Sequence, residues 1–105
     1  MPKSQKRHHD TALYEAISKL RDRDECIRFF EELCTPTEMR SLEQRFEVAC
    51  CLLKDQVYTK ILESTGASSA TISRVKRTIV EDSSGAVCRA IEALEREKNR
   101  QEEMM

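Results

Sequence analysis

The strongest constraint on the fold is the helix start at Thr35-Pro36-Thr37-Glu38. A threonine followed three residues later by a glutamate forms a capping box, in which each side chain bonds the other residue's backbone N–H. Pro36 takes the first helical position, where its missing N–H costs nothing. Apolar residues then recur at helical spacing as far as Lys54. They are Met39, Leu42, Phe46, Ala49, Leu52 and Leu53. A long amphipathic helix is predicted here, and its outward face consists of Arg40, Glu43, Gln44 and Glu47.

Two helices are predicted before this one. The first starts at Asp10 or Thr11 and ends before the polar residues 21–24, because apolar residues recur at helical spacing between them. The second begins with Asp24 as its N-cap. Its expected buried side chains are Ile27, Phe30 and Leu33.

Three further helices are predicted after it. Residues 57–65 form a short helix that carries Ile61 and Leu62 inward, and Gly66 provides the turn that follows. Ser68 or Ser69 then caps a helix to Ile79. Its expected buried residues are Ala70, Ile72, Val75 and Ile79. After a break at 81–85, the last helix carries Val87, Cys88, Ile91 and Leu94 and continues into a charged end that we expect to fray.

Composition supports an all-α fold. Two glycines and two prolines among 105 residues leave few turns for an all-β chain. The length suits one domain, which we place at 10–105, with residues 1–9 as a mobile tail because they lack an apolar period. So short a chain buries only a limited core by itself, and a homodimer would relieve that shortage.

The sequence argues against metal, disulfide and membrane chemistry. The five cysteines have no CxxC spacing and no neighbouring histidine, so we expect reduced thiols that act as small buried hydrophobes. We interpret His8 and His9 as solvated rather than as metal ligands. No signal peptide and no apolar run of membrane-spanning length is present. We therefore expect a cytoplasmic protein.

Positive charge is concentrated in one part of the chain. The formal net charge is −1, but residues 54–79 hold five basic and two acidic residues, whereas residues 81–105 hold four basic and seven acidic ones. A local positive field suits a single face that docks on nucleic acid.

The two short helices around Gly66 have the shape of a helix-turn-helix, at about 58–79. If Gly66 is the turn, the exposed positions carry short hydroxyls first and cations later. They are Ser68, Ser69, Thr71, Ser73, Lys76 and Arg77. Short side chains let a helix start approach base edges and phosphates. The alternative is a capped helix start followed by a solvated face, and helical periodicity does not separate the two.

The stretch LCTPTEMRSLEQRFEVACCLL, followed by TGASSATISR, resembles the trp operon repressor family, especially its YerC/YecD-type branch, to which RFFEELCT and ATISRVKR are also similar. The resemblance implies a six-helix fold, an intertwined homodimer and a helix-turn-helix that reads two half-sites of an operator about one DNA turn apart. It also implies which residues read DNA. They are Gly66, Ala67, Ser68, Ser69, Ala70, Thr71 and Ser73, with Thr59 near a phosphate.

The resemblance extends to a ligand pocket with altered residues. The positions that correspond to the family's tryptophan site are Thr35, Arg45, Arg74 and Thr78. Val75 stands where the family's repressor has a glycine against the indole, and Glu32 and Cys34 replace leucines. We therefore expect no tryptophan binding and no other cofactor. Arg45 and Arg74 fit a solvated or ion-paired role better than a site for an unknown effector.

Three functional hypotheses follow. The first is a sequence-specific transcription regulator, which in most of the family is a repressor. The stretch LLKDQVYTKI, before the helix-turn-helix, is one residue shorter than in its relatives, and this difference could tilt the helix-turn-helix. The second is a dimeric protein-interaction module that uses the acidic last helix and the Phe29-Phe30 region, with weak DNA contact. An enzyme is disfavoured, because the sequence has no phosphate loop and pairs no cysteine with a base.

Overall fold

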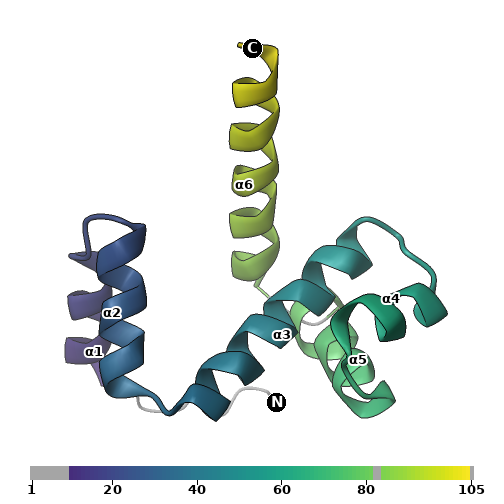
Figure 1. The fold of residues 1–105 in the computed structure, drawn as a ribbon, viewed down its shortest axis with the longest axis horizontal. Coiled ribbons are helices and arrows are strands. Elements are labelled where there is room, and N and C mark those ends of the chain that lie inside the picture. The colour runs from purple at the N-terminus through teal and green to yellow at the C-terminus, as the bar shows by residue number, and fades with distance from the viewer. Residues whose placement is uncertain (1–9, 82–83, 105) are drawn as a thin grey trace. The chain divides into compact units, whose positions relative to one another are not determined.

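The computed structural model describes residues 10–81 and 84–104, and these residues are helical without any strand (Figure 1). The all-α prediction is confirmed, and the tail predicted at residues 1–9 lies outside the described residues. None of the described helices is both long and apolar enough to cross a membrane. The helices are α1 (Thr11–Ser18), α2 (Arg23–Leu33), α3 (Pro36–Leu53), α4 (Tyr58–Thr65), α5 (Ser69–Val75), the π-helix η1 (Lys76–Glu81) and α6 (Ala86–Glu103).

The described residues form two compact units that divide within α3, between Met39 and Arg40. The first unit contains α1, α2 and the start of α3. The second contains the rest of α3 and all later helices. A single domain over 10–105 stays a prediction.

The helices of the first unit begin at side-chain caps. The Asp10 carboxylate accepts from the N–H of Ala12 at 3.0 Å, as predicted for the start of α1. In α2 the cap is Asp22, which accepts from the N–H of Glu25 at 2.9 Å. The prediction of Asp24 as this cap is wrong, because Asp22 has the extended backbone of an N-cap, whereas Asp24 already lies in the first turn, where its charge favours the helix dipole.

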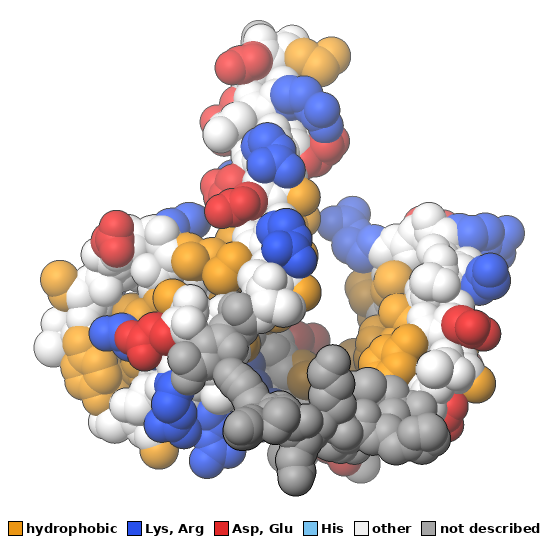
Figure 2. Space-filling model, turned by 180° about the vertical axis from the view of Figure 1, so that it is seen from behind, with side chains coloured by type: hydrophobic (Ala, Val, Ile, Leu, Met, Phe, Trp, Pro, Cys, Tyr) orange, Lys and Arg blue, Asp and Glu red, His pale blue; other side chains and the backbone are white. Residues whose placement is uncertain are grey.

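No side chain of α1 or α2 is fully buried. Leu33 is 58% and Ile27 is 44% exposed, so their predicted burial is wrong for the single chain. Phe30 is half-buried and packs edge to face on Phe29, with ring centroids 5.3 Å apart. Helices of 8 and 11 residues are too short to enclose a core between them. Figure 2 shows hydrophobic side chains on the surface.

The capping box of α3 is confirmed. The backbone N–H of Glu38 donates to Thr35 Oγ1 at 3.1 Å, and the N–H of Thr35 donates to Glu38 Oε1 at 2.9 Å. At the other end, Asp55 lies in the left-handed region with φ 57. The N–H groups of Asp55 and Gln56 donate to the carbonyls of Leu52 and Cys51, which is the bond pattern of a Schellman motif.

The second unit contains the core. Its fully buried residues come from α3, α4, the following turn, α5 and α6. They are Val48, Ala49, Ile61, Ala67, Ile72, Val75 and Ile91. The predicted apolar stripe of α3 is partly wrong, because Leu42 and Phe46 are exposed whereas Val48 is buried. The part of α3 that packs within this unit is its second half, where Val48 and Ala49 are buried and Cys50, Cys51, Leu52 and Leu53 pack against the core. The five cysteines are free and half-buried.

The last two helical segments differ in hydrogen bonding. The helix predicted from Ser68 or Ser69 to Ile79 is α5 continued by the π-helix η1. After Gly85, with φ 92, α6 runs unbroken to Glu103. Ile91 buries α6 against the core, while Leu94 is 56% exposed. Acidic and basic side chains alternate along the far end of α6 (Figure 2).

Candidate nucleic-acid interface

Helices α4 and α5 are joined by a three-residue turn whose backbone is specified by its sequence. Gly66 ends α4 in the left-handed region, with φ 70 and ψ 9, and its N–H donates to the Leu62 carbonyl at 3.0 Å. A residue with a Cβ is strained there, so glycine suits the position. Ser68 starts α5, and its Oγ accepts from the N–H of Thr71 at 3.1 Å. The element order and turn length are those of a helix-turn-helix.

The inner face of this helix-turn-helix, α4 to α5, joins the core of the second unit. Ile61 is 1% exposed, Ile72 is 3% and Val75 is 1%. Leu62 is half-buried beside them. Their burial as the packed side of the motif is therefore confirmed, and it fixes which side chains point to solvent.

Most of the residues predicted to contact DNA are solvent-exposed, and their contact with DNA stays a prediction. The exposed ones are Thr59, Gly66, Ser68, Ser69, Ala70, Ser73, Lys76 and Arg77. Thr71 is half-buried, and its hydroxyl lies 3.1 Å from Ser68 Oγ. The two hydroxyls thus stand together at the start of α5.

Two alanines differ from expectation. Ala67 was predicted at the DNA surface, but its side chain is only 4% exposed and its N–H donates to Thr65 Oγ1 at 3.1 Å. The Ala67 side chain is therefore part of the core. Ala70 was predicted to be buried as well as near DNA, yet it is exposed. On an α-helix the residue two positions before Ile72 lies roughly opposite it, so burial of Ile72 turns Ala70 outward.

No ion pair among the described residues involves Lys76 or Arg77. Among the described residues, the ion pairs join Arg21 to Glu25, Lys54 to Glu95 and Arg100 to Glu97. Lys76 and Arg77 take part in none of them and are exposed. Their charge is available to an anionic partner.

Two of the four residues predicted for a ligand pocket line the same pocket. Arg45 of α3 and Arg74 of α5 line a pocket of about 190 Å³, together with Ala70, Thr71 and Val75. Thr78 is not part of its lining and donates its hydroxyl to the Arg74 carbonyl at 2.8 Å. Thr35 belongs to the first unit, where it caps α3.

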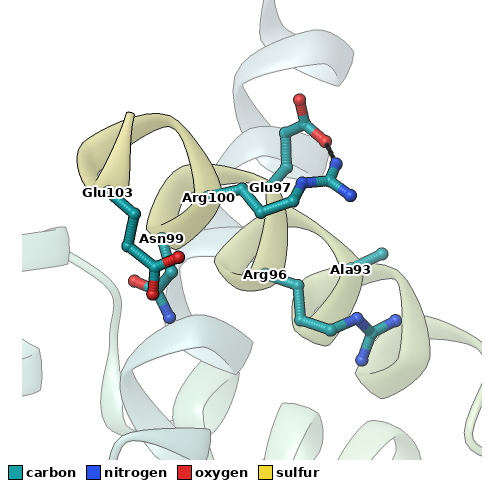
Figure 3. Close-up of a pocket in the computed structure, with 6 residues that line it drawn as sticks. All are labelled: Ala93, Arg96, Glu97, Asn99, Arg100 and Glu103. Atoms are coloured by element: carbon teal, nitrogen blue, oxygen red, sulfur yellow. Dashed lines mark hydrogen bonds and ion pairs between the residues drawn. The ribbon is translucent and has the colours of Figure 1, made fainter. Parts of the chain in front are cut away.

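A larger hollow of about 450 Å³ lies along α6 (Figure 3). Its lining consists of Ala93, Arg96, Glu97, Asn99, Arg100 and Glu103. All of these residues belong to one helix, and the carboxylate of Glu97 pairs with Arg100. A surface formed by one helix does not surround a ligand as a concave binding pocket does.

The structural role of Gln44 was not predicted from the sequence, which placed this residue on the outward face of α3. Its side chain is half-buried, and Nε2 donates to the Thr65 carbonyl at 3.1 Å. The prediction is wrong because Gln44 precedes the buried Val48 by one helical turn and so lies above the packed face of α3. That spacing was the available signal, but the polarity of Gln44 obscured it.

Comparisons with known proteins agree with this architecture. The family model of the Trp repressor protein matches residues 8–95. The uncharacterized protein YerC of Bacillus subtilis is 54% identical over 67 residues, which are 64% of this chain and 64% of that protein, so the match spans less than two thirds of its length.

Two solved structures are similar over most of the chain. A candidate Trp repressor from Staphylococcus aureus has a TM-score of 0.77 and 39% identity, covering 81% of this chain and 84% of the other. A TrpR-like protein from Eubacterium eligens has a TM-score of 0.76 and 46% identity, covering 80% and 86%. With the helix order and the helix-turn-helix already described, these matches show that the chain belongs to the Trp repressor family, in the branch that includes YerC.

Proposed function

We propose that this protein is a sequence-specific DNA-binding transcription regulator, acting as a repressor, whose helix-turn-helix docks α5 on an operator. One observation carries the proposal. The buried face of α5 holds Ile72 and Val75, which leaves a row of hydroxyls and then cations exposed beyond a tight turn. Hydroxyl groups can bond base edges and phosphates, and cations attract the backbone. Family membership supports the same function.

Regulation of this kind requires the protein to occupy its DNA site and involves no chemical reaction. Among the described residues no group of three or more histidine, cysteine or acidic side chains could hold a metal ion. We propose that the protein acts by binding alone, because it belongs to the Trp repressor family.

A selection experiment tests the proposal. A pool of random duplex DNA is titrated with the wild-type protein and with Thr71→Ala/Ser73→Ala, and the bound DNA is sequenced. Thr71→Ala retains the helix cap, because the cap bond uses the Thr71 backbone N–H. Thr37→Ala/Ser41→Ala makes the same pair of changes at exposed positions of α3 and serves as the matched control.

The expected result is an enriched pseudo-palindromic site that the control binds like wild type and the α5 variant binds more weakly. Log K should fall by about 0.9 per phosphate contact against log salt. No enrichment, with equal binding by all three proteins, would favour the protein-interaction module instead. The half-buried Phe29–Phe30 pair of α2 would then be the first surface to mutate.

We also propose that the protein acts as a homodimer. Both units expose large apolar side chains that a single chain leaves uncovered. They include Ile27, Leu33, Leu42, Phe46 and Leu94. Burial of such residues against a second copy would be favourable. Sedimentation as a stable 12.2 kDa monomer at micromolar concentration would refute this proposal.

Tryptophan is proposed not to control DNA binding. Val75 lines the same pocket as Arg45 and Arg74, and the volume of about 190 Å³ is below the usual range for small-molecule sites, about 300–1,000 Å³. Calorimetry with tryptophan should therefore show no heat of binding at micromolar concentrations. Micromolar affinity would overturn the expectation.

A further inference from the structure

A side chain of the core helix reaches the end of the helix-turn-helix's first helix. Gln44 Nε2 on α3 donates to the carbonyl of Thr65, the last residue of α4, at 3.1 Å in a partly buried position. An α-helix leaves its last four carbonyls without an intrahelical partner. Gln44 therefore satisfies an acceptor that the helix itself cannot.

Thr65 also connects α4 to the turn. Its Oγ1 donates to the Ile61 carbonyl at 2.8 Å and accepts from the N–H of Ala67 at 3.1 Å. Ala67 is itself buried, and Ser68, the N-cap of α5, comes directly after it. A shift of Thr65 would consequently be passed along three residues to the start of α5.

Few polar contacts hold this end of α4 to α3. Among the described residues, the other such contact is between Cys51 Sγ and Ser64 Oγ, at 4.0 Å. A thiol is a weak hydrogen-bonding group, so Gln44 supplies the stronger and more directional bond. Both helices also contribute buried apolar side chains to the core, and apolar burial is non-directional.

We propose that Gln44 is a positioning residue that holds the turn between α4 and α5 in one orientation on α3, and so fixes how α5 is presented to DNA. The inference rests on the proposed function for its consequence, but the hydrogen bond itself can be tested without DNA. Gln44 acts through Thr65 and is not proposed to touch DNA.

The variant Gln44→Met removes the amide and keeps similar length and net charge. Gln44→Glu keeps the shape but replaces the donor with a carboxylate, which cannot donate at neutral pH. Gln101→Met is the matched control, because Gln101 is exposed on α6 and its amide bonds only the neighbouring Glu97, at 3.4 Å. If Gln44→Met failed to fold, Gln44→Glu would carry the test.

Amide hydrogen exchange of Ala67 reports on the order of the turn that Gln44 is proposed to hold, since this N–H donates to Thr65 Oγ1. We expect exchange at Ala67 to accelerate about two- to tenfold in both Gln44 variants, the range that the net contribution of one neutral hydrogen bond allows. Exchange at the buried Val48 and Ala49 should remain as in wild type. Affinity for the selected DNA should fall by a similar factor, with an unchanged salt slope.

Unchanged exchange at Ala67 would overturn the proposal, and so would equal acceleration at Val48 and Ala49, because the role of Gln44 would then be general stability. A wild-type protein that selects no DNA would contradict the proposed function, while the exchange result would still decide whether Gln44 holds the turn. Faster exchange together with unchanged affinity of the variants for a selected site would refute the positioning role alone.

Discussion

Replacement of Gly66 by alanine tests the backbone argument for the helix-turn-helix. No atom lies within 4 Å of the position that a Cβ would take at Gly66, so the new methyl meets no neighbour. The cost arises from the backbone alone, at φ 70, and the left-handed conformation costs an L-residue about 1–2 kcal/mol. Gly66→Ala should therefore destabilise the protein by that amount. Gly66→Asn should cost less, because asparagine tolerates this region better.

Urea denaturation followed by circular dichroism measures both variants, with the protein concentration held fixed because association would alter the apparent stability. Gly85→Ala provides a comparison, since φ is 92 and the added Cβ would lie 3.0 Å from Arg89 Nη1. Arg89 can move away, because Nη1 is the end of a flexible side chain. The left-handed backbone still strains an alanine, so Gly85→Ala should cost at least as much as Gly66→Ala. A loss below about 0.3 kcal/mol for Gly66→Ala, or a larger loss for Gly66→Asn, would refute the reasoning, since strain of about 1–2 kcal/mol is its premise.

Three further predictions concern local features. Thr35→Ala removes the acceptor of the Glu38 N–H and should lower the free energy of unfolding by about 0.5–2 kcal/mol in urea. The backbone N–H of Arg21, followed by its guanidinium, lowers the pKa of Glu25; because the folded pKa lies below the unfolded one, this stabilisation is present at neutral pH and is lost as the pH falls through the lowered pKa. Glu25→Gln should flatten the acid limb of a pH–stability curve, and an unchanged limb would contradict this. Burial raises the pKa of the Cys50 thiol, so mass spectrometry should show slower alkylation of Cys50 by iodoacetamide at neutral pH in the folded protein than in urea.

The sequence was most informative where a short local pattern determines the backbone. The capping box at Thr35 and Glu38, the left-handed turn at Gly66 and the cap at Ser68 all depend on residues within four positions of one another. Their hydrogen bonds do not depend on tertiary contacts, so they could be predicted without knowledge of the tertiary structure. The burial of Ile61, Ile72 and Val75 followed from helical periodicity for the same reason, whereas Ala70, which was also predicted to be buried, is exposed.

Features that depend on distant neighbours were less accessible. Apolar residues occur on two faces of α3, and periodicity could not tell that Val48 would be buried while Phe46 is exposed. Gln44 was placed outward because polar residues usually are, but the unsatisfied carbonyl of Thr65, 21 residues away, provides its partner. Of the predicted pocket, Arg45 and Arg74 line one hollow because α3 and α5 both pack on one core.

The π-helix η1 also bears on how the length of this chain can change in evolution. Its i→i+5 bonds enclose one more residue per turn than the i→i+4 bonds of an α-helix, and it directly follows Val75, the last residue of α5. A single-residue deletion within Lys76–Glu81 could therefore be absorbed by conversion to α-helical bonding, with α5 left in place. The segment after α5 should accordingly accept length variation that the three-residue turn before α5, fixed by Gly66 and Ser68, would not.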